Sequence, residues 1–316
     1  MERMVKVKLY YATDLHAGET CFRKFLNSAK FYGANALICG GDLSGKMVVP
    51  IIKTARGVYE ATYYGSTVKI KKELEVVKLI RNLRNAGFYT IIVTEAELDR
   101  YSEDDAKRIT KEQTSSVLEG WIKMADERLK AHDVPCIVMP GNDDPDYIDS
   151  ILDGAAYIQN GGGKVLRLLD CEVLSLPYAI PSPFKYPRDI PEDELAEKID
   201  ALAADVINMD KCIFNIHIPP YDTDCDVGVI YNEDLSPVVD GGELAMDHIG
   251  SKAVRTAIEK YQPLLALGGH IHECRGISKI GRTICVNPGS DYDQGSLKGA
   301  LIDISGDRVK YTLTAG

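Results

Sequence analysis

The chain has 316 residues, 45% of them hydrophobic and 27% charged, which is typical of a folded globular protein and excludes a disordered or collagen-like chain. With 37 Lys and Arg against 47 Asp and Glu, the formal charge is −10, and this acidic excess disfavours stable binding of nucleic acid. Residues 1–8 lack the apolar core of a signal peptide, and no run of about 18 apolar residues follows, so we expect a cytoplasmic protein without membrane attachment.

The first part of the chain predicts a β-α-β unit. Residues 5–13 are rich in Val, Leu and Tyr, which favours a strand. Residues 21–32 have apolar side chains at helical spacing and are followed by Gly33, and residues 36–39 are apolar again.

The stretch 45–114 has signals of its own. It predicts a hairpin over residues 59–72 and a helix over residues 73–86. It is basic and aromatic at its start and acidic later, which fits either a solvated surface or a cap over an active site. Because no long linker separates it from the rest, we expect a single domain over residues 1–316 with an inserted cap at 46–112.

The remaining chain alternates helices with buried strands, which predicts a layered α/β fold. Helical stretches such as 116–131 and 251–261 precede apolar strands, which are expected at 135–139, 211–216 and 264–267. Shorter strands separated by Gly, Asp and Ser predict that the C-terminal half adds a second, mixed sheet. These strands are expected at 164–169, 171–179, 277–286, 300–304 and 309–313.

The eight cysteines contain no CxxC pair, so the sequence does not support a zinc-thiolate site. Several lie inside apolar, strand-like runs, where a reduced thiol behaves as a small hydrophobic group. We therefore expect buried free thiols, among them Cys39, Cys136, Cys212 and Cys285.

Five short polar motifs each follow directly on an apolar strand, and they contain four of the six histidines. Because ligands of α/β sheets bind at the carboxyl ends of the strands, we expect these five segments to converge on one crevice. The motifs are Asp14-Leu15-His16, Gly40-Gly41-Asp42, Gly141-Asn142-Asp143-Asp144, His217 and Gly269-His270-Ile271-His272.

The residue types in these motifs match the needs of a metal site. Asp, Asn and His supply oxygen and nitrogen donors suited to manganese, iron, zinc or nickel. Residues i and i+2 of an extended chain point to the same face, so the D-x-H motif and the H-x-H motif can each present two ligands to one centre. Asp14 and Asp42 are about one β-α-β unit apart, which places them on adjacent strand ends.

In this order the motifs resemble those of the calcineurin-like metallophosphoesterases, and in particular their small microbial phosphoesterase branch. The resemblance spans most of the chain. Four further segments look like recurrent loops of that branch, namely Asn287-Pro288-Gly289-Ser290, Ser182-Pro183-Phe184, His217-Ile218-Pro219-Pro220 and Gly250-Ser251.

The resemblance implies a mixed α/β fold, a four-layer α/β/β/α sandwich of two mixed sheets, with two divalent metal ions. Manganese is the preferred metal, and iron, zinc or nickel are alternatives. Such a pair of cations lowers the pKa of a bridging water, and the resulting hydroxide attacks phosphorus without a covalent protein intermediate. The implied ligands are Asp14, His16 and His272 for one ion, Asn142, His217 and His270 for the other, and Asp42 as the bridge.

Position 143 departs from the family pattern, in which a His acts on the leaving group. An Asp beside two cations should have a lowered pKa and be a poor proton donor. Three roles stay open for Asp143: orienting substrate or water, accepting a structural hydrogen bond, or acting as general acid. Its charge would repel phosphate, which favours phosphodiesters over monoesters. Asp144 is expected to anchor the loop.

A second candidate for leaving-group chemistry is His248. It precedes Ser251, which predicts the N-cap of a helix whose start could face the pocket and help hold an anion. The alternative is a histidine at a helix entry with no ligand role.

The insertion lies between two ligand-bearing loops, so we expect it to lie beside the metal cleft and to contact the substrate beyond its phosphate. The candidate contacts are Arg56, Tyr63, Tyr64 and Lys69.

The sequence therefore predicts a metal-dependent hydrolase that acts on a small-molecule or nucleotide phosphodiester. A phosphomonoesterase or nucleotidase is the alternative, and a non-catalytic metal-binding scaffold for protein interactions is the second. The sequence makes no prediction of oligomeric state.

Overall fold

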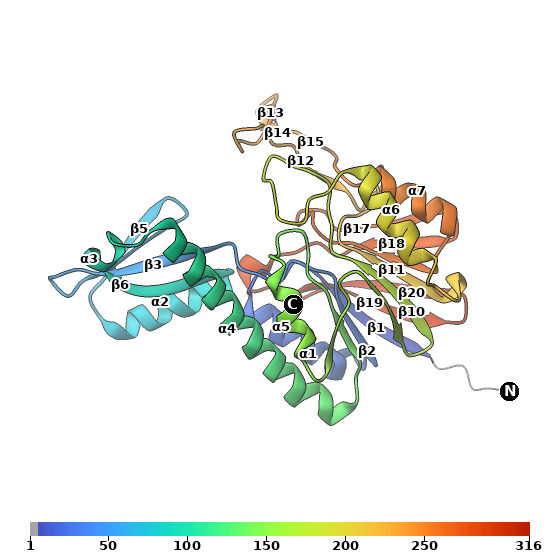
Figure 1. Cartoon of the computed structure of the whole chain (residues 1–316), viewed down its shortest axis with the longest axis horizontal. Helices are drawn as coiled ribbons and strands as arrows, with labels where there is room; N and C mark the ends of the chain where they lie inside the picture. Colours follow the sequence, from blue (N-terminus) through green and yellow to red (C-terminus); the bar gives the residue numbers. More distant parts are fainter. Residues whose placement is uncertain (1–5) are drawn as a thin grey trace.

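Two six-stranded sheets form the body of the protein, packed face to face (Figure 1). The computed structural model describes residues 6–316. Two expectations concern residues outside this range. They are the start of the first predicted strand, at Val5, and the absence of a signal peptide in residues 1–8, most of which are not described. Within residues 6–316, no helix has the length and apolar character needed to cross a membrane.

The first sheet consists, in spatial order, of β20 (Arg308–Ala315), β19 (Lys298–Ser305), β1 (Val7–Ala12), β2 (Ala36–Cys39), β7 (Cys136–Val138) and β8 (Ile158–Asn160). The last four strands run parallel, and β19 runs antiparallel to β1. The expectation that the C-terminal strands join the second sheet is wrong for β19 and β20. The open edge of β1 takes β19 as its hydrogen-bonded partner, with Leu9 opposite Ile302.

The second sheet consists of β17 (Gly276–Ile280), β18 (Thr283–Asn287), β16 (Leu265–Leu267), β11 (Cys212–Ile216), β10 (Cys171–Leu176) and β9 (Lys164–Leu168). Its inner strands are parallel and its two edge strands are antiparallel, so the sheet is mixed, as predicted. The single strand expected over 277–286 is instead a hairpin, because Gly281, with a φ of 58°, turns the chain between β17 and β18.

Helices cover both outer faces, which gives four layers. The first sheet is covered by α1 (Glu19–Tyr32), α4 (Glu103–Leu129) and α5 (Tyr147–Asp153), and the second by α6 (Glu192–Ala203) and α7 (Lys252–Tyr261). Apolar side chains of both sheets, including Tyr11, Ile38 and Ile213, fill the layer between them. The predicted layered α/β architecture is confirmed. Short 3₁₀ helices lie at η1 (Lys130–His132), η2 (Met209–Lys211) and η3 (Tyr292–Gln294).

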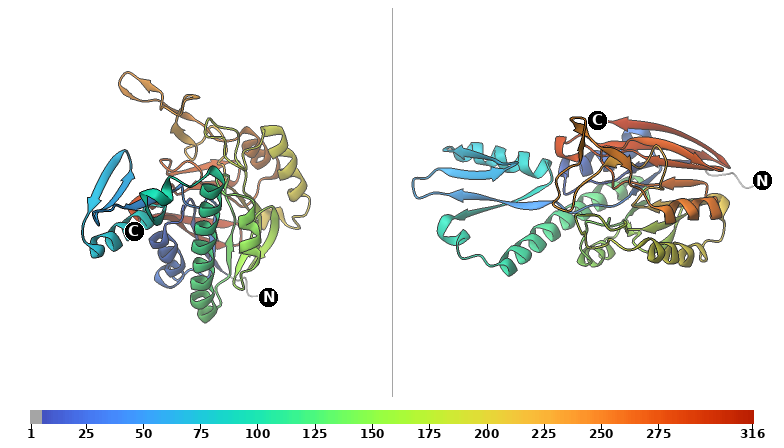
Figure 2. Two further views of the ribbon diagram at one scale, coloured as in Figure 1. Left: turned by 60° about the vertical axis from the view of Figure 1, so that its left-hand side comes forward. Right: turned by 90° about the horizontal axis from the view of Figure 1, so that it is seen from above.

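Residues 47–98 form a separate unit with its own apolar core. Its sheet consists of β5 (Ser66–Ile70), β4 (Tyr59–Tyr63), β3 (Met47–Lys53) and β6 (Phe88–Thr94), followed by α3 (Glu95–Leu98), and α2 (Glu73–Asn85) contributes to its core. Figures 1 and 2 show this unit projecting from the two sheets, with α4 leading the chain back to them. Helix α4 starts earlier than predicted because Ser102 and Asp105 form a capping box at its N-terminus.

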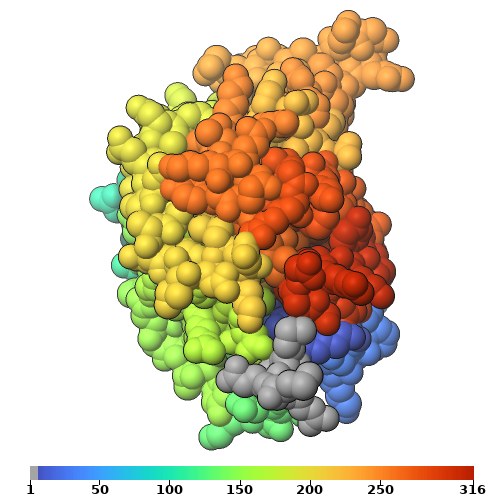
Figure 3. All heavy atoms as spheres, turned by 90° about the vertical axis from the view of Figure 1, so that its right-hand side faces the viewer, coloured from blue at the N-terminus to red at the C-terminus, as the bar shows by residue number. Residues whose placement is uncertain are grey.

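Residues 227–248 form a narrow antiparallel ribbon that the sequence analysis did not expect. It is built from β12 (Val227–Val229) paired with β15 (Met246–His248), and β13 (Val239–Asp240) paired with β14 (Glu243–Leu244). Figures 1 and 3 show the ribbon standing out from the body.

All eight cysteines are buried and free, as predicted. Burial raises the pKa of these thiols, for example to about 11 for Cys21. They therefore act as small apolar groups of the packed layers.

Candidate metal centre

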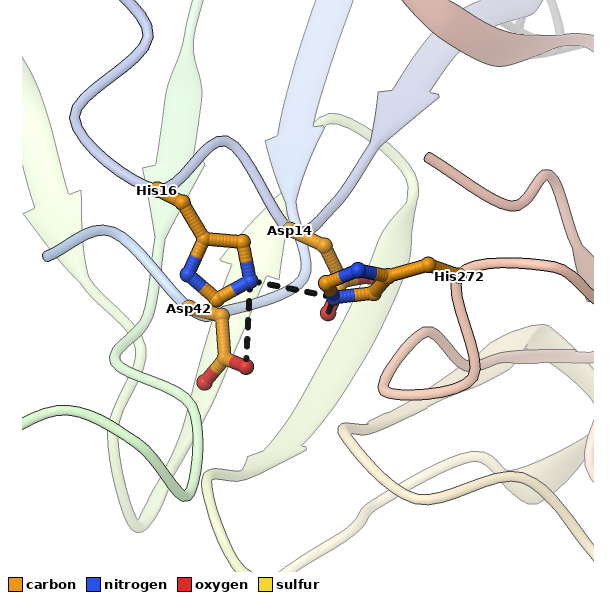
Figure 4. Close-up of side chains that lie close together, drawn as sticks. All are labelled: Asp14, His16, Asp42 and His272. Carbon is orange, nitrogen blue, oxygen red and sulfur yellow. Dashed lines mark hydrogen bonds and ion pairs between the residues drawn. The ribbon is translucent and has the colours of Figure 1, made fainter. Parts of the chain in front are cut away.

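The polar motifs converge at the carboxyl ends of the parallel strands. Ligand atoms of Asp14, His16, Asp42 and His272 all lie within 4.8 Å of one another, a cluster that could hold a metal ion (Figure 4). Three of these residues are buried and His272 is partly exposed. The loops after β1, β2 and β16 supply them, as expected for ligands that bind at the carboxyl ends of parallel strands.

The backbone of the cluster is held in the left-handed region. Asp14, His16, Asp42 and His270 have φ values of 55°, 40°, 52° and 67°. Such conformations cost about 1–3 kcal/mol for a residue other than glycine and persist where surrounding contacts enforce them. The fold therefore positions these side chains at the expense of local backbone stability.

The first donor group has two imidazoles facing each other. His16 Nε2 lies 3.0 Å from His272 Nε2, and the other nitrogen of His16 lies 3.2 Å from the carbonyl oxygen of Ser44. If His16 Nδ1 donates to that carbonyl, its Nε2 presents a lone pair to His272. Asp42 Oδ2 is 3.6 Å from His16 Nε2. This set of nitrogen and carboxylate donors fits a divalent cation.

A second donor group adjoins the first. His217 Nδ1 lies 2.8 Å from the carbonyl oxygen of Gly40, and its buried Nε2 has no hydrogen-bond partner among the described residues. That nitrogen is 3.4 Å from Asp42 Oδ1. Asn142 donates from Nδ2 to Asp189, which turns its oxygen to within 3.0 Å of His270 Nδ1. The unpartnered nitrogen is a site that a cation would satisfy.

The cluster concentrates negative charge in the interior. Burial opposes ionisation of Asp14, but the hydrogen bond and charge of His272 lower the pKa of that carboxyl to about 2. Burial likewise opposes ionisation of Asp42, but His217 holds its pKa well below the ordinary value. Against burial, Asp42 raises the pKa of His217 to about 9. The two carboxylates thus draw positive charge to the site, and a divalent cation could supply it.

Two glycines and one carboxylate pack the ligand-bearing loops together. A Cβ at Gly141 would lie 2.2 Å from Asp42 Oδ1, and one at Gly41 would lie 2.6 Å from His217 Nδ1, so no larger residue fits at either position. Asp144 is fully buried and accepts hydrogen bonds from the backbone N–H groups of Leu43, Ser44 and Gly141. Asp144 anchors the loop, as predicted.

Asp143 lies at the edge of the cluster and is paired with a lysine that the sequence analysis did not select as a site residue. Lys46 Nζ donates to Asp143 Oδ2 at 2.6 Å, and the same oxygen lies 3.7 Å from His16 Nδ1. In the protein itself, burial and the charge of Asp42 raise the pKa of Asp143 to about 6, against Lys46. The expected lowering of this pKa thus depends on bound cations.

A cavity of about 590 Å³ opens beside the cluster, and Asp42, His270 and His272 lie on its wall. The ribbon and the loops after β10 and β11 supply much of the remaining wall, with aromatic side chains that include Phe184, Tyr186, Tyr221 and Tyr231.

The insertion contributes one residue to this cavity, Lys46 at its root. None of the four residues proposed as substrate contacts lines this cavity, so the cavity gives that expectation no support. The unit that bears them projects away from the body, and Lys69 is paired with Glu60 inside its own sheet.

His248 lines the same cavity as His270 and His272. Its Nδ1 lies 2.8 Å from the buried carboxylate of Asp226, and this hydrogen bond raises the pKa of His248. Asp226 also accepts from the backbone N–H groups of Thr223 and Gly250. The imidazole is thereby held in one orientation at the cavity wall.

The start of helix α7 is not open to an anion, so the structure does not support the first of the two alternatives for this region. Ser251 caps the helix by accepting from the N–H of Val254, as predicted. However, the Glu192 carboxylate accepts from the N–H groups of Lys252 and Ala253. A carboxylate of the chain itself therefore occupies the place where an anion would bind.

No family model matches the chain. It is 32% identical over 159 residues to an uncharacterized protein of Methanocaldococcus jannaschii, a match that spans 48% of this chain and 62% of that protein. Its structure is similar to that of TT1561 of Thermus thermophilus, with a TM-score of 0.54, 14% identity, and coverage of 98% of this chain and 99% of that one. A protein described as a novel archaeal phosphodiesterase aligns with a TM-score of 0.35 and 10% identity, over 98% of this chain and all of that one. The likeness to TT1561 shows the fold.

Proposed function

We propose that the chain is a binuclear metal-dependent phosphoesterase that hydrolyses a small-molecule or nucleotide phosphodiester. The observation on which this proposal depends is the buried cluster of carboxylates and imidazoles at the strand ends. Folding and packing do not require four donor atoms within reach of one another, whereas a metal site does.

Asp42 has the geometry expected of a residue shared by two ions. Its Oδ2 faces His16 Nε2 at 3.6 Å, and its Oδ1 faces His217 Nε2 at 3.4 Å. Each carboxylate oxygen thus points to a different donor group. We assign Asp14, His16 and His272 to one ion and Asn142, His217 and His270 to the other. When bound, a pair of divalent ions activates water and neutralises charge on phosphate oxygens.

The cavity suits a small substrate with a flat organic group. Phe184 and Tyr186 are stacked with ring centroids 5.6 Å apart, and Phe184 meets Tyr231 edge to face at 5.0 Å. Phe184 and Tyr231 keep 39% and 37% of their surface exposed, so both can contact a ligand. Aromatic faces of this kind stack on nucleobases and other planar rings.

The alternative is a phosphomonoesterase, and the ion pair of Lys46 with Asp143 favours it. An unpaired carboxylate beside the metals would repel a dianionic monoester more than a monoanionic diester. Because Lys46 Nζ lies 2.6 Å from Asp143, it neutralises much of that charge.

A paired rate comparison tests the proposal. The manganese-loaded and metal-free protein are each assayed on an aryl phosphodiester and on the matching aryl monoester at equal concentration and pH. We expect metal-dependent hydrolysis with a preference for the diester. Asp42→Asn should abolish turnover and reduce the number of bound ions, while His132→Gln, an exposed histidine outside the cluster, should change neither.

A preference for the monoester would overturn the phosphodiesterase proposal in favour of the phosphomonoesterase. Metal binding without hydrolysis of either ester would overturn the enzymatic assignment and leave the non-catalytic scaffold.

A further inference from the structure

Lys46 presents a fixed ammonium group at the entrance to the metal cluster. Its side chain is 31% exposed, and its Nζ donates to Asp143 and lies 5.5 Å from the ring centroid of Tyr186. An ammonium has three N–H donors. Within residues 6–316 the hydrogen-bond acceptor of Nζ is Asp143, which leaves N–H groups available to the cavity that Lys46 lines.

Asp143 fixes this ammonium relative to the cluster. Its backbone N–H donates to Asp42 Oδ1 at 3.1 Å, and its side chain lies between Lys46 Nζ and His16 Nδ1. One carboxylate oxygen, Asp143 Oδ2, thus holds the ammonium beside the candidate ligand His16.

Lys46 also lies where the two halves of a substrate would meet. On one side are the cluster residues, and on the other is the aromatic wall that begins at Tyr186. A phosphoryl group bound at the cluster, with its organic group against the aromatic wall, would place the connecting ester oxygen near Lys46.

We propose that Lys46 is a further catalytic residue of the phosphoesterase, which hydrogen-bonds the leaving-group oxygen, and that Asp143 is its positioning residue. This inference depends on the proposed function. As the new bond from the water oxygen to phosphorus forms, the bond from phosphorus to the leaving oxygen breaks, and that oxygen departs with the bonding pair. Lys46 stabilises this charge and keeps its own proton. The water releases one proton to solvent, and the departed oxygen takes up one from solvent.

The test measures kcat for Lys46→Met and Lys46→Arg on a series of aryl phosphodiesters whose phenols span a wide range of pKa. We expect Lys46→Met to lose about 100-fold with the poorest leaving groups, as when a single charge-stabilising donor is removed, and only a few-fold with the best ones. Lys46→Arg should retain most of the activity. Asp143→Asn should steepen the dependence on leaving-group pKa in the direction of Lys46→Met.

Lys252→Met is the matched control, because Lys252 also lines the cavity but lies over a different ring from Lys46. Its Nζ is 5.2 Å from the ring centroid of Tyr221. It should leave the leaving-group dependence unchanged. Metal content is measured for every variant, so that loss of an ion is not mistaken for loss of the ammonium.

An equal loss on every ester, or no loss, would overturn the role of Lys46 while leaving the phosphoesterase assignment in place. Failure of the metal-loaded wild-type chain to hydrolyse any ester would overturn both.

Discussion

Three of the candidate ligands are oriented by a partner behind them. The carbonyl oxygens of Ser44 and Gly40 contact the outer nitrogens of His16 and His217, and Asp189 accepts from the amide of Asn142. Such contacts fix which atom faces the site, and their loss typically weakens metal binding. At the scale of single residues, these contacts point the donor atoms of the three ligands into the cluster.

Asp144→Ala should destabilise the protein strongly. The substitution leaves three buried backbone N–H groups, those of Leu43, Ser44 and Gly141, without their acceptor. At about 1–3 kcal/mol for each such group, we expect the free energy of unfolding to fall by about 3 kcal/mol or more. Urea denaturation measures it, with the exposed Asp146→Ala as control. Equal stability of the two variants would contradict the anchoring role.

His248 should stabilise the protein more at low pH than at high pH. Its hydrogen bond to Asp226 raises its folded pKa above the ordinary value of 6.5. The stabilisation is therefore fully present below about pH 6.5 and is lost as the pH rises through the folded pKa. The difference in unfolding free energy between wild type and His248→Gln should shrink as the pH rises from about 6 to about 9, and NMR titration of the imidazole should give a pKa above the ordinary value. A pKa at or below that value would contradict this coupling.

Helix α4 connects the insertion to the body of the protein, and an aromatic stack is one of the contacts that pack it there. The rings of Trp121 and Phe22, the latter in α1, lie parallel, with centroids 4.2 Å apart and an angle of 3° between them. Both side chains are buried in the core that covers the first sheet. This contact joins the helix that leaves the insertion to the helix that follows the first ligand-bearing loop.

Trp121→Ala should lower the free energy of unfolding by about 3–5 kcal/mol, the usual cost of removing a large buried aromatic side chain. Because Trp121 is not among the donors, metal stoichiometry at low temperature should be unchanged. Chemical denaturation and metal analysis measure the two effects, with the exposed Lys123→Ala as control. A lost metal ion in Trp121→Ala would show that the helix positions the cluster as well as stabilising the fold.

At the scale of the whole molecule, the ribbon supplies several residues of the cavity wall, whereas the insertion supplies Lys46 at its root. Tyr231 of the ribbon lines it, whereas Tyr63 of the insertion does not. Tyr231→Ala should therefore raise KM for a diester that bears a nucleobase by about 10-fold, in line with about 1–3 kcal/mol for each stacked base. Tyr63→Ala is the matched control and should leave KM unchanged. The opposite pattern would return the insertion to its expected role as the substrate-binding cap.

The pattern of apolar residues along the sequence was sufficient to predict many of the helices and strands. The period of apolar residues located β2 at its observed bounds and placed α1, β7, β11, β16 and α7 closely. The boundary of α4 was missed because the capping box at Ser102 lies outside the apolar pattern used to find it. The ribbon was missed as well, since its strands are only two or three residues long.

The candidate ligands could also be found in the sequence, because Asp, Asn and His follow strands whose carboxyl ends must meet. The residues that surround these ligands could not be found in this way. Lys46 reaches Asp143 across 97 residues, Asp226 reaches His248 across 22, and Glu192 covers the start of α7 from 60 residues away. Propensity and period act over a few residues, whereas these ion pairs and hydrogen bonds form only when packing brings distant segments together. The sequence alone therefore determined the chemical types of the donors. The tertiary structure determined which charged and polar neighbours contact them.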